Sequence, residues 1–196
     1  MKHSEIRQTI IETASNLFYE QGYNSTGINE IIATAGIAKA TLYNHFRSKE
    51  EICLAYLQYM NDSFLAGIRK FYLTKSTGQA QIIALFDFLL GFFQESDFNG
   101  CWCINTISEI PKDNQLIRNE IQLQKKHLIG VINNLVQNTF LNKSVGEIDL
   151  IARQIYLLYE SAVAESHLHQ ENWPILAARK LCLQLLQFEA AAIPAS

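Results

Sequence analysis

Residues 23–52 read YNSTGINEIIATAGIAKATLYNHFRSKEEI, and this stretch decides the fold of the N-terminal part of the chain. A helical run of apolar residues around Ile31 ends at Gly36, and a second short run places Leu42 and Phe46 four residues apart. Two short helices joined by a glycine-centred turn are typical of a helix-turn-helix. We expect a small apolar core to hold the two helices at a steep angle, formed by Ile31, Ile37, Leu42 and Phe46.

The second helix of this pair is expected to present a surface suited to DNA. No Asp or Glu occurs between Ile31 and Lys49, although the whole chain has a net charge of −3. A basic window in an acidic protein indicates a surface that contacts phosphate. The outward side chains are small or form hydrogen bonds, as a helix in the major groove requires. They are Lys39, Ala40, Thr41, Tyr43, Asn44 and His45.

The rest of the chain also follows helical periodicity. A first helix is expected to end near Gly22, and Thr26 to cap the second. Ser48 and Glu51 form a capping box that opens a long helix to about Leu73. Polar breaks at 74–78, 96–100, 111–114, 142–146 and 170–174 separate five further helices. The predicted fold is all-α with about nine helices, divided into a helix-turn-helix domain (1–47) and a larger helical domain (48–196).

Composition limits the classes of protein that need consideration. Of 196 residues, 48% are hydrophobic and 18% charged, which suffices for a hydrophobic core. The most apolar segment, 82–93, is too short to span a bilayer, and no secretory signal is visible, so a cytoplasmic protein without membrane contact is expected. No enzyme motif is present, so neither catalysis nor a cofactor is expected. A helical adaptor that binds another protein is an alternative interpretation. The basic window favours DNA binding over this alternative.

Three segments of the chain, 26–31, 35–46 and 49–51, resemble the TetR family of transcriptional repressors. The resemblance covers about a quarter of the chain. It implies a homodimeric repressor that binds a palindromic double-stranded operator and is released by a small-molecule effector. It also implies phosphate contacts by Thr26, Tyr43, His45 and Lys49, and contacts to base edges by Asn29, Lys39, Ala40, Thr41 and Asn44.

Two departures from the family pattern concern the second helix of the pair. The family often has Ser at the position of Ala38 and Gly at the position of Ala40. Losing a Ser cap costs a helix about 1 kcal/mol. The methyl group of Ala40 could contact a thymine methyl or restrict the approach of the backbone to DNA. These departures leave the binding mode unchanged and the operator sequence open.

The resemblance further implies that the C-terminal region dimerises and binds the effector. Two long helices, 146–169 and 172–190, would form a four-helix interface, or their apolar stripes would face the core of their own subunit. The predicted interface residues are Ile155, Tyr159, Ala162, Ala178, Cys182 and Leu185. The predicted pocket is rich in aromatic residues, which at helical spacing are also typical of a core. Its residues are Tyr56, Tyr59, Met60, Phe86, Phe93, Trp102, Asn105, Tyr156 and Glu160.

Residues 100–105 read GCWCIN and are the most unusual segment. They resemble a Gly-Cys stretch in TetR-family members that sense electrophiles and oxidants. Cys101 and Cys103 could therefore be a second trigger, because a cysteine at a helix N-terminus can be reactive, or they could pack as small hydrophobic residues. Together with His167 and His169 they lack the usual spacing of a zinc site, so no metal is expected.

Overall fold

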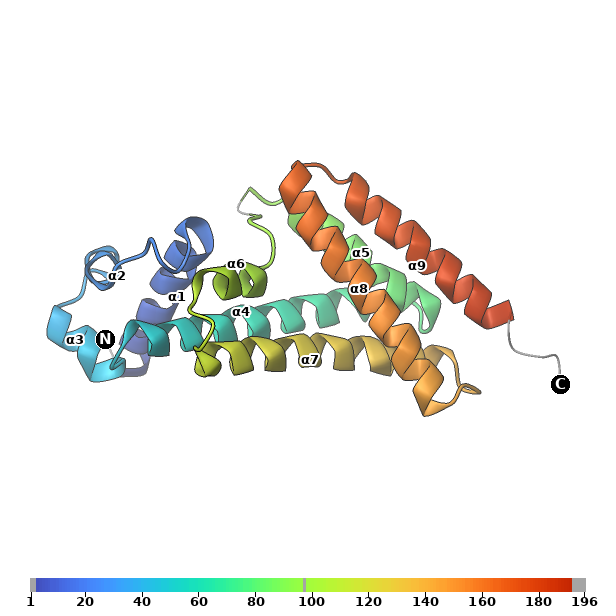
Figure 1. Ribbon diagram of the computed structural model, residues 1–196, viewed down its shortest axis with the longest axis horizontal. Helices are drawn as coiled ribbons and strands as arrows, with labels where there is room; N and C mark the ends of the chain where they lie inside the picture. Colours follow the sequence, from blue (N-terminus) through green and yellow to red (C-terminus); the bar gives the residue numbers. More distant parts are fainter. Residues whose placement is uncertain (1–2, 97, 192–196) are drawn as a thin grey trace. The chain divides into compact units, whose positions relative to one another are not determined.

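The computed structural model describes residues 3–96 and 98–191, and this part of the chain folds into nine helices with no strand (Figure 1). The all-helical prediction is confirmed, and each predicted polar break overlaps a connection between helices, although those at 142–146 and 170–174 extend into the first residues of α8 and α9. The helices are α1 (His3–Gln21), α2 (Ile28–Ala35), α3 (Lys39–His45), α4 (Lys49–Tyr72), α5 (Gln79–Phe93), α6 (Trp102–Glu109), α7 (Gln115–Thr139), α8 (Val145–His169) and α9 (Trp173–Ala191).

The chain forms two compact units, and the first comprises Met1–Phe64 and Cys101–Gln124. It contains α1 to α3, the first part of α4, α6 and the beginning of α7. Its core is continuous from the helix-turn-helix to α4 and α6, because Ile31, Leu42, Phe46, Tyr56 and Cys103 belong to one buried cluster. The three N-terminal helices therefore share a core with α4 and α6 and do not form an isolated bundle.

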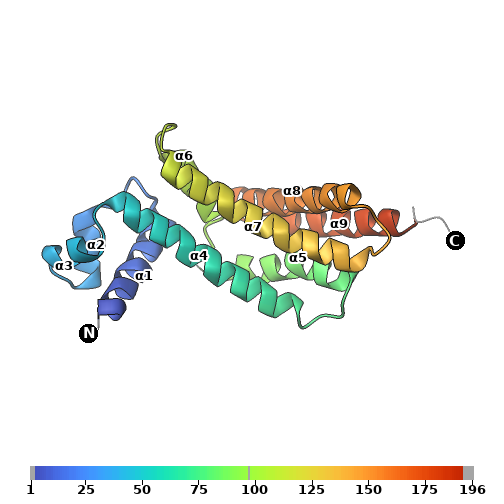
Figure 2. The same ribbon diagram turned by 90° about the horizontal axis from the view of Figure 1, so that it is seen from below.

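The second unit comprises Leu65–Gly100 and Lys125–Ser196. Within it α8 and α9 run antiparallel, joined by a short turn, and α5 packs against both (Figure 2). All residues from 81 to 86 in α5 are buried, as expected of a helix in the middle of a bundle. The Arg179 guanidinium donates a hydrogen bond of 2.7 Å to Asp87 and so ties α9 to α5.

The first residues of α2, α3 and α4 show which of the predicted helix caps are present. Ser48 accepts a hydrogen bond from the Glu51 amide at 3.1 Å, and the Glu51 carboxylate accepts one from the Arg47 amide at 2.7 Å, so the predicted capping box is present with Arg47 as the reciprocal donor. Ala38 is the N-cap of α3 and supplies no side-chain hydrogen bond. The prediction that Thr26 caps α2 is wrong, because the N-cap is Gly27.

The predicted boundary at residue 47 lies in the short connection between α3 and α4. The first compact unit extends past this point to Phe64 and takes in residues 101–124. A functional division at residue 47 thus stays a prediction. Among the described helices, none is both long and apolar enough to cross a membrane.

Candidate nucleic-acid interface

The helix-turn-helix is formed by α2, a tight turn and α3. Gly36 adopts the left-handed conformation with φ 65° and ψ 34°, and its amide donates to the Ala33 carbonyl at 3.2 Å. Glycine tolerates this conformation at no steric cost, so the chain reverses within one residue. Ile31, Leu42 and Phe46 are almost fully buried, as the sequence predicted. Ile37 packs against the same core and is partly buried.

The residues on the opposite face of α3 are exposed. Tyr43 retains 45% of its surface, and Thr41 is half-buried. Asn29 on α2 is exposed as well. Most of the predicted base-reading residues are therefore exposed to solvent within a single unit. Those on α3 are Lys39, Ala40 and Asn44.

Thr26 is a correction to the predicted phosphate-contact set. Its side chain is fully buried, and its hydroxyl lies 2.9 Å from the Gly22 carbonyl and 3.2 Å from the Leu17 carbonyl. The hydroxyl is therefore directed at carbonyl groups near and just after the end of α1. It is not available to a phosphate in this conformation. The spacing of the sequence could not show that the side chain turns inward.

Lys49, at the start of α4, lies with its ammonium nitrogen 4.3 Å from the ring centroid of Tyr23. Burial lowers the pKa of Lys49, while Cys53 and Glu109 nearby act in the opposite direction. Burial also raises the pKa of Tyr23 to about 12, so the phenol is neutral at physiological pH. The ring supports a cation at the first turn of α4, as a cation–π contact does.

His45, the last residue of α3, is half-buried and contacts the ring of His3, with 4.0 Å between the ring centroids. Its Nδ1 atom is buried without a hydrogen-bond partner. Burial lowers the pKa of His45, and the neighbouring His3 and Arg7 lower it further. The guanidinium of Arg7 in turn lies 4.9 Å from the ring centroid of Phe46. This corner of the unit therefore concentrates basic side chains.

The residues predicted for an effector pocket divide between the two units. In the first unit, Tyr56 is buried and packs edge-on against Phe18, with 5.5 Å between ring centroids. In the second, Phe86 is buried against Tyr159, and Glu160 forms an ion pair of 2.6 Å with Lys125. Tyr56 and Phe86 thus serve the cores of their units in this conformation. The remaining members are Trp102, which is buried, and Tyr59, Met60, Phe93, Asn105 and Tyr156, which are half-buried.

The unusual cysteine segment forms the start of α6. Cys101 is the N-cap residue and is half-buried, whereas Cys103 is buried. The Oε1 atom of the buried Gln124 accepts hydrogen bonds from Cys103 Sγ at 3.4 Å and from Trp102 Nε1 at 3.2 Å. The other two cysteines, Cys53 and Cys182, lie in the cores, where burial raises the pKa of each thiol to about 12. Within the described residues, no three potential metal ligands form a cluster.

The predicted dimer stripe needs correction. Ile155, Tyr159, Ala162, Ala178 and Cys182 are buried within the single chain, and Leu185 is half-buried. A side chain without exposed surface cannot contact a partner subunit in this conformation. The stripes therefore form the core of their own unit, which is the alternative that the sequence left open. A second set of apolar residues on α8 and α9 is exposed: Leu150, Leu157, Leu168, Trp173, Leu176, Leu181 and Phe188.

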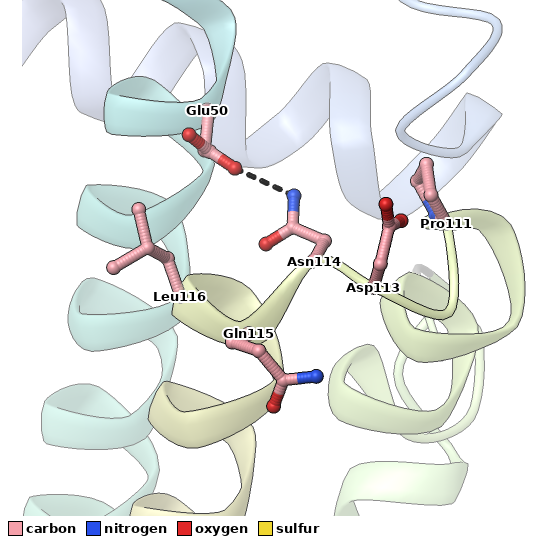
Figure 3. A pocket seen from close by; sticks show the side chains of 6 residues that line it. All are labelled: Glu50, Pro111, Asp113, Asn114, Gln115 and Leu116. Atoms are coloured by element: carbon pink, nitrogen blue, oxygen red, sulfur yellow. Dashed lines mark hydrogen bonds between the residues drawn. The ribbon is translucent and has the colours of Figure 1, made fainter.

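A pocket of about 450 Å³ lies in the first unit between the first turn of α4 and the connection from α6 to α7 (Figure 3). The Asn114 side-chain amide donates to the Glu50 carboxylate across it, and Asn114 Oδ1 accepts from the Ile117 amide at 3.1 Å. The lining combines two carboxylates and two side-chain amides with two apolar residues, and it contains none of the predicted effector residues. It consists of Glu50, Pro111, Asp113, Asn114, Gln115 and Leu116.

An N-terminal helix-turn-helix with an exposed second helix, followed by longer helices, defines a class of helical transcriptional regulators. The sequence model described as "Bacterial regulatory proteins, tetR family" matches residues 10–56. The resemblance to the TetR family seen in the sequence is therefore confirmed for the helix-turn-helix region.

Three relatives illustrate the extent of the similarity. The transcriptional activator FasR of Mycolicibacterium smegmatis is 36% identical over 93 residues, which are 45% of this chain and only 42% of FasR. The transcriptional repressor NemR of Escherichia coli is 22% identical over 89% of this chain and 91% of NemR, and the crystal structure of its reduced form superposes with a TM-score of 0.81. SCO4454, a TetR-family regulator from Streptomyces coelicolor, superposes with a TM-score of 0.84 at 22% identity, over 95% of this chain and 90% of SCO4454.

Proposed function

We propose that this protein is a transcriptional repressor that binds a palindromic operator as a homodimer in the cytoplasm, where the operator DNA is. The exposed face of α3 carries this proposal. Lys39 and Asn44 can donate hydrogen bonds to base edges, and Tyr43 can donate to a phosphate. The core of Ile31, Leu42 and Phe46 fixes the orientation of that face. FasR is an activator and NemR a repressor, so the direction of regulation is part of the proposal.

A second copy of this chain is the proposed occupant of the exposed apolar faces of α8 and α9. These two helices are antiparallel neighbours, and two such pairs make a four-helix interface. The faces carry several leucines, together with Trp173 and Phe188, which is 70% exposed. Apolar patches of this extent mark interaction sites in proteins. A two-fold axis then presents two α3 helices to successive major grooves, about 34–36 Å apart.

The decisive experiment is a gel shift with the promoter region adjoining the coding sequence of this protein. A duplex of scrambled sequence is the specificity control, and Asn44→Ala is the matched variant, because Asn44 is exposed and its loss leaves the core intact. We expect specific binding by the wild type and weaker, less selective binding by the variant. Equal binding of both duplexes by the wild type would refute sequence-specific recognition.

Release from the operator requires an event that favours the conformation unable to bind DNA. A small-molecule effector between the helices of the C-terminal region is our first candidate. The alternative is oxidation or alkylation at Cys101 or Cys103. Two observations support this second route. Cys101 is the N-cap of α6 and is half-buried. The Cys103 thiol donates a hydrogen bond to the buried Gln124. Addition of the Cys103 thiolate to an electrophilic carbon–carbon double bond would form a sulfur–carbon bond, break the π bond and return the thiol proton to the neighbouring carbon. The hydrogen bond from Cys103 to Gln124 would then be lost.

A further inference from the structure

The last residue of α6 holds the loop that connects α1 and α2. The Glu109 carboxylate accepts a hydrogen bond from the Asn24 backbone amide at 2.6 Å, and the Asn24 side-chain amide donates to the Glu109 carbonyl at 2.8 Å. The two residues are 85 positions apart in the sequence. Asn24 thus donates both hydrogen bonds and Glu109 accepts both. Two hydrogen bonds between the same residues, one of them to a charged carboxylate, are stronger and more directional than a single neutral hydrogen bond.

Gly22 makes the close approach of Glu109 feasible. It has φ +94°, which side-chain-bearing residues rarely adopt, and a Cβ atom added there would lie 2.5 Å from Glu109 Oε1. Thr26 fastens the same loop from the other side, because its hydroxyl contacts the Gly22 carbonyl. The loop is therefore fixed at both ends, and Gly27, the N-cap of α2, follows directly.

The beginning of α6 is attached elsewhere in the same unit. Trp102 and Cys103 both donate to Gln124 of α7, and Gln124 donates to Glu120 at 2.9 Å. Because α6 has only eight residues, it is a short and stiff connection between these two attachments. A displacement of its N-terminal turn is transmitted to Glu109 at its other end.

We propose that Glu109 is a positioning residue for DNA binding, which couples α6 to the helix-turn-helix by holding the loop before α2. This rests on the proposed function, since it concerns how the DNA-binding surface is oriented. The positioning role and the charge of Glu109 predict opposite effects of its removal on DNA affinity. Glu109 is an acid in the unit that binds phosphates, so its removal should strengthen binding if electrostatics were its only influence. Loss of position weakens binding, and the sign of the change separates the two roles.

The test compares Glu109→Ala, Glu109→Gln and Glu20→Ala. Glutamine keeps an oxygen that can accept the Asn24 amide, and Glu20 is an exposed acid near the end of α1 whose removal changes charge alone. Amide hydrogen exchange at Asn24 in the free protein reports the hydrogen bond itself. We expect fast exchange in Glu109→Ala only. Operator affinity should fall about tenfold in Glu109→Ala, with an unchanged salt slope, while Glu109→Gln stays close to wild type and Glu20→Ala binds equally or more tightly.

Tighter operator binding by Glu109→Ala, with Asn24 exchanging rapidly, would overturn the positioning role and leave an electrostatic one. Unchanged affinity would overturn it too. If the thermal melt shows that Glu109→Ala is unfolded, the test rests on Glu109→Gln. A tenfold loss of operator affinity in Glu109→Gln, with slow amide exchange at Asn24, also overturns the proposal. Failure of the wild type to bind any operator is distinguishable, because it refutes the proposed function while the exchange experiment still reports on the hydrogen bond.

Discussion

The Lys49 ammonium nitrogen lies 4.3 Å from the ring centroid of Tyr23, which joins the first turn of α4 to the loop before α2. A lysine at a helix N-terminus faces the positive end of the helix dipole, and contact with the ring offsets part of this unfavourable interaction. A phosphate would be a stronger partner, and binding of DNA would replace the ring contact with a charge pair.

Replacement of Lys49 with Ala should therefore weaken binding to all duplexes alike. We expect the slope of log affinity against log salt to become shallower by about one unit. Titrations by fluorescence anisotropy at several salt concentrations measure both quantities. Lys70→Ala, at an exposed position in the last turn of α4, is the matched control and should leave the slope unchanged. A wild-type slope in Lys49→Ala would remove Lys49 from the phosphate-contact set.

The dependence of DNA binding on pH follows from His45. Its pKa in the free protein lies below the usual 6.5, because burial, His3 and Arg7 disfavour the charged form. A phosphate at His45 would favour that form, so binding takes up a proton and operator affinity should rise as the pH falls from 8 to 6. The stability of the free protein changes in the opposite sense. The unfolded chain binds more protons over the interval between the two pKa values, so stability falls as the pH falls.

The variant His45→Gln tests how much His45 contributes to the pH dependence of operator affinity. Its operator affinity should vary less with pH than that of the wild type, while His127→Gln, an exposed substitution on α7, should retain the wild-type profile. Binding isotherms between pH 6 and 8 at constant salt provide the measurement. Identical profiles for His45→Gln and the wild type would show that this histidine does not contact phosphate.

Two substitutions on α8 distinguish the core from the proposed dimer surface. Ile155 is fully buried, whereas Leu157 is 64% exposed. Ile155→Asp places an unpaired charge in the core and should lower the free energy of unfolding by about 4 kcal/mol. Leu157→Asp should give folded monomers that bind the operator weakly. Light scattering and thermal unfolding distinguish the two outcomes, and Leu141→Asp, at a residue 84% exposed in the connection to α8, is the control. A stable dimer of Leu157→Asp would place the interface elsewhere.

The sequence predicted the helices well because polar breaks and apolar periodicity are local properties. It predicted the core of the helix-turn-helix for the same reason, since Ile31, Leu42 and Phe46 repeat at helical spacing. It assigned to the dimer surface a stripe that is buried in its own unit, because both faces of α8 and α9 carry apolar residues and periodicity does not reveal which face packs against α5. The inward turn of Thr26 and the hydrogen bonds between Glu109 and Asn24 depend on contacts between distant segments. In the sequence, Gly22 indicated only the end of the first helix.

If a cysteine is the trigger, the structure predicts which cysteines react first, as well as the release of the protein from the operator. Cys101 is half-buried at the start of α6, Cys103 is buried, and burial raises the pKa of Cys53 and Cys182 to about 12. The thiolate is the reactive form, so N-ethylmaleimide at pH 7.5 should label Cys101 first and Cys103 more slowly, and leave Cys53 and Cys182 unlabelled in the folded protein. Mass spectrometry of peptides against time provides the order.

If labelling releases the operator from the wild type, the double variant Cys101→Ser, Cys103→Ser should remain bound, and Cys182→Ala should respond like the wild type. Equal release from the double variant and the wild type would exclude this pair as the sensor and leave the non-covalent effector as the route of induction.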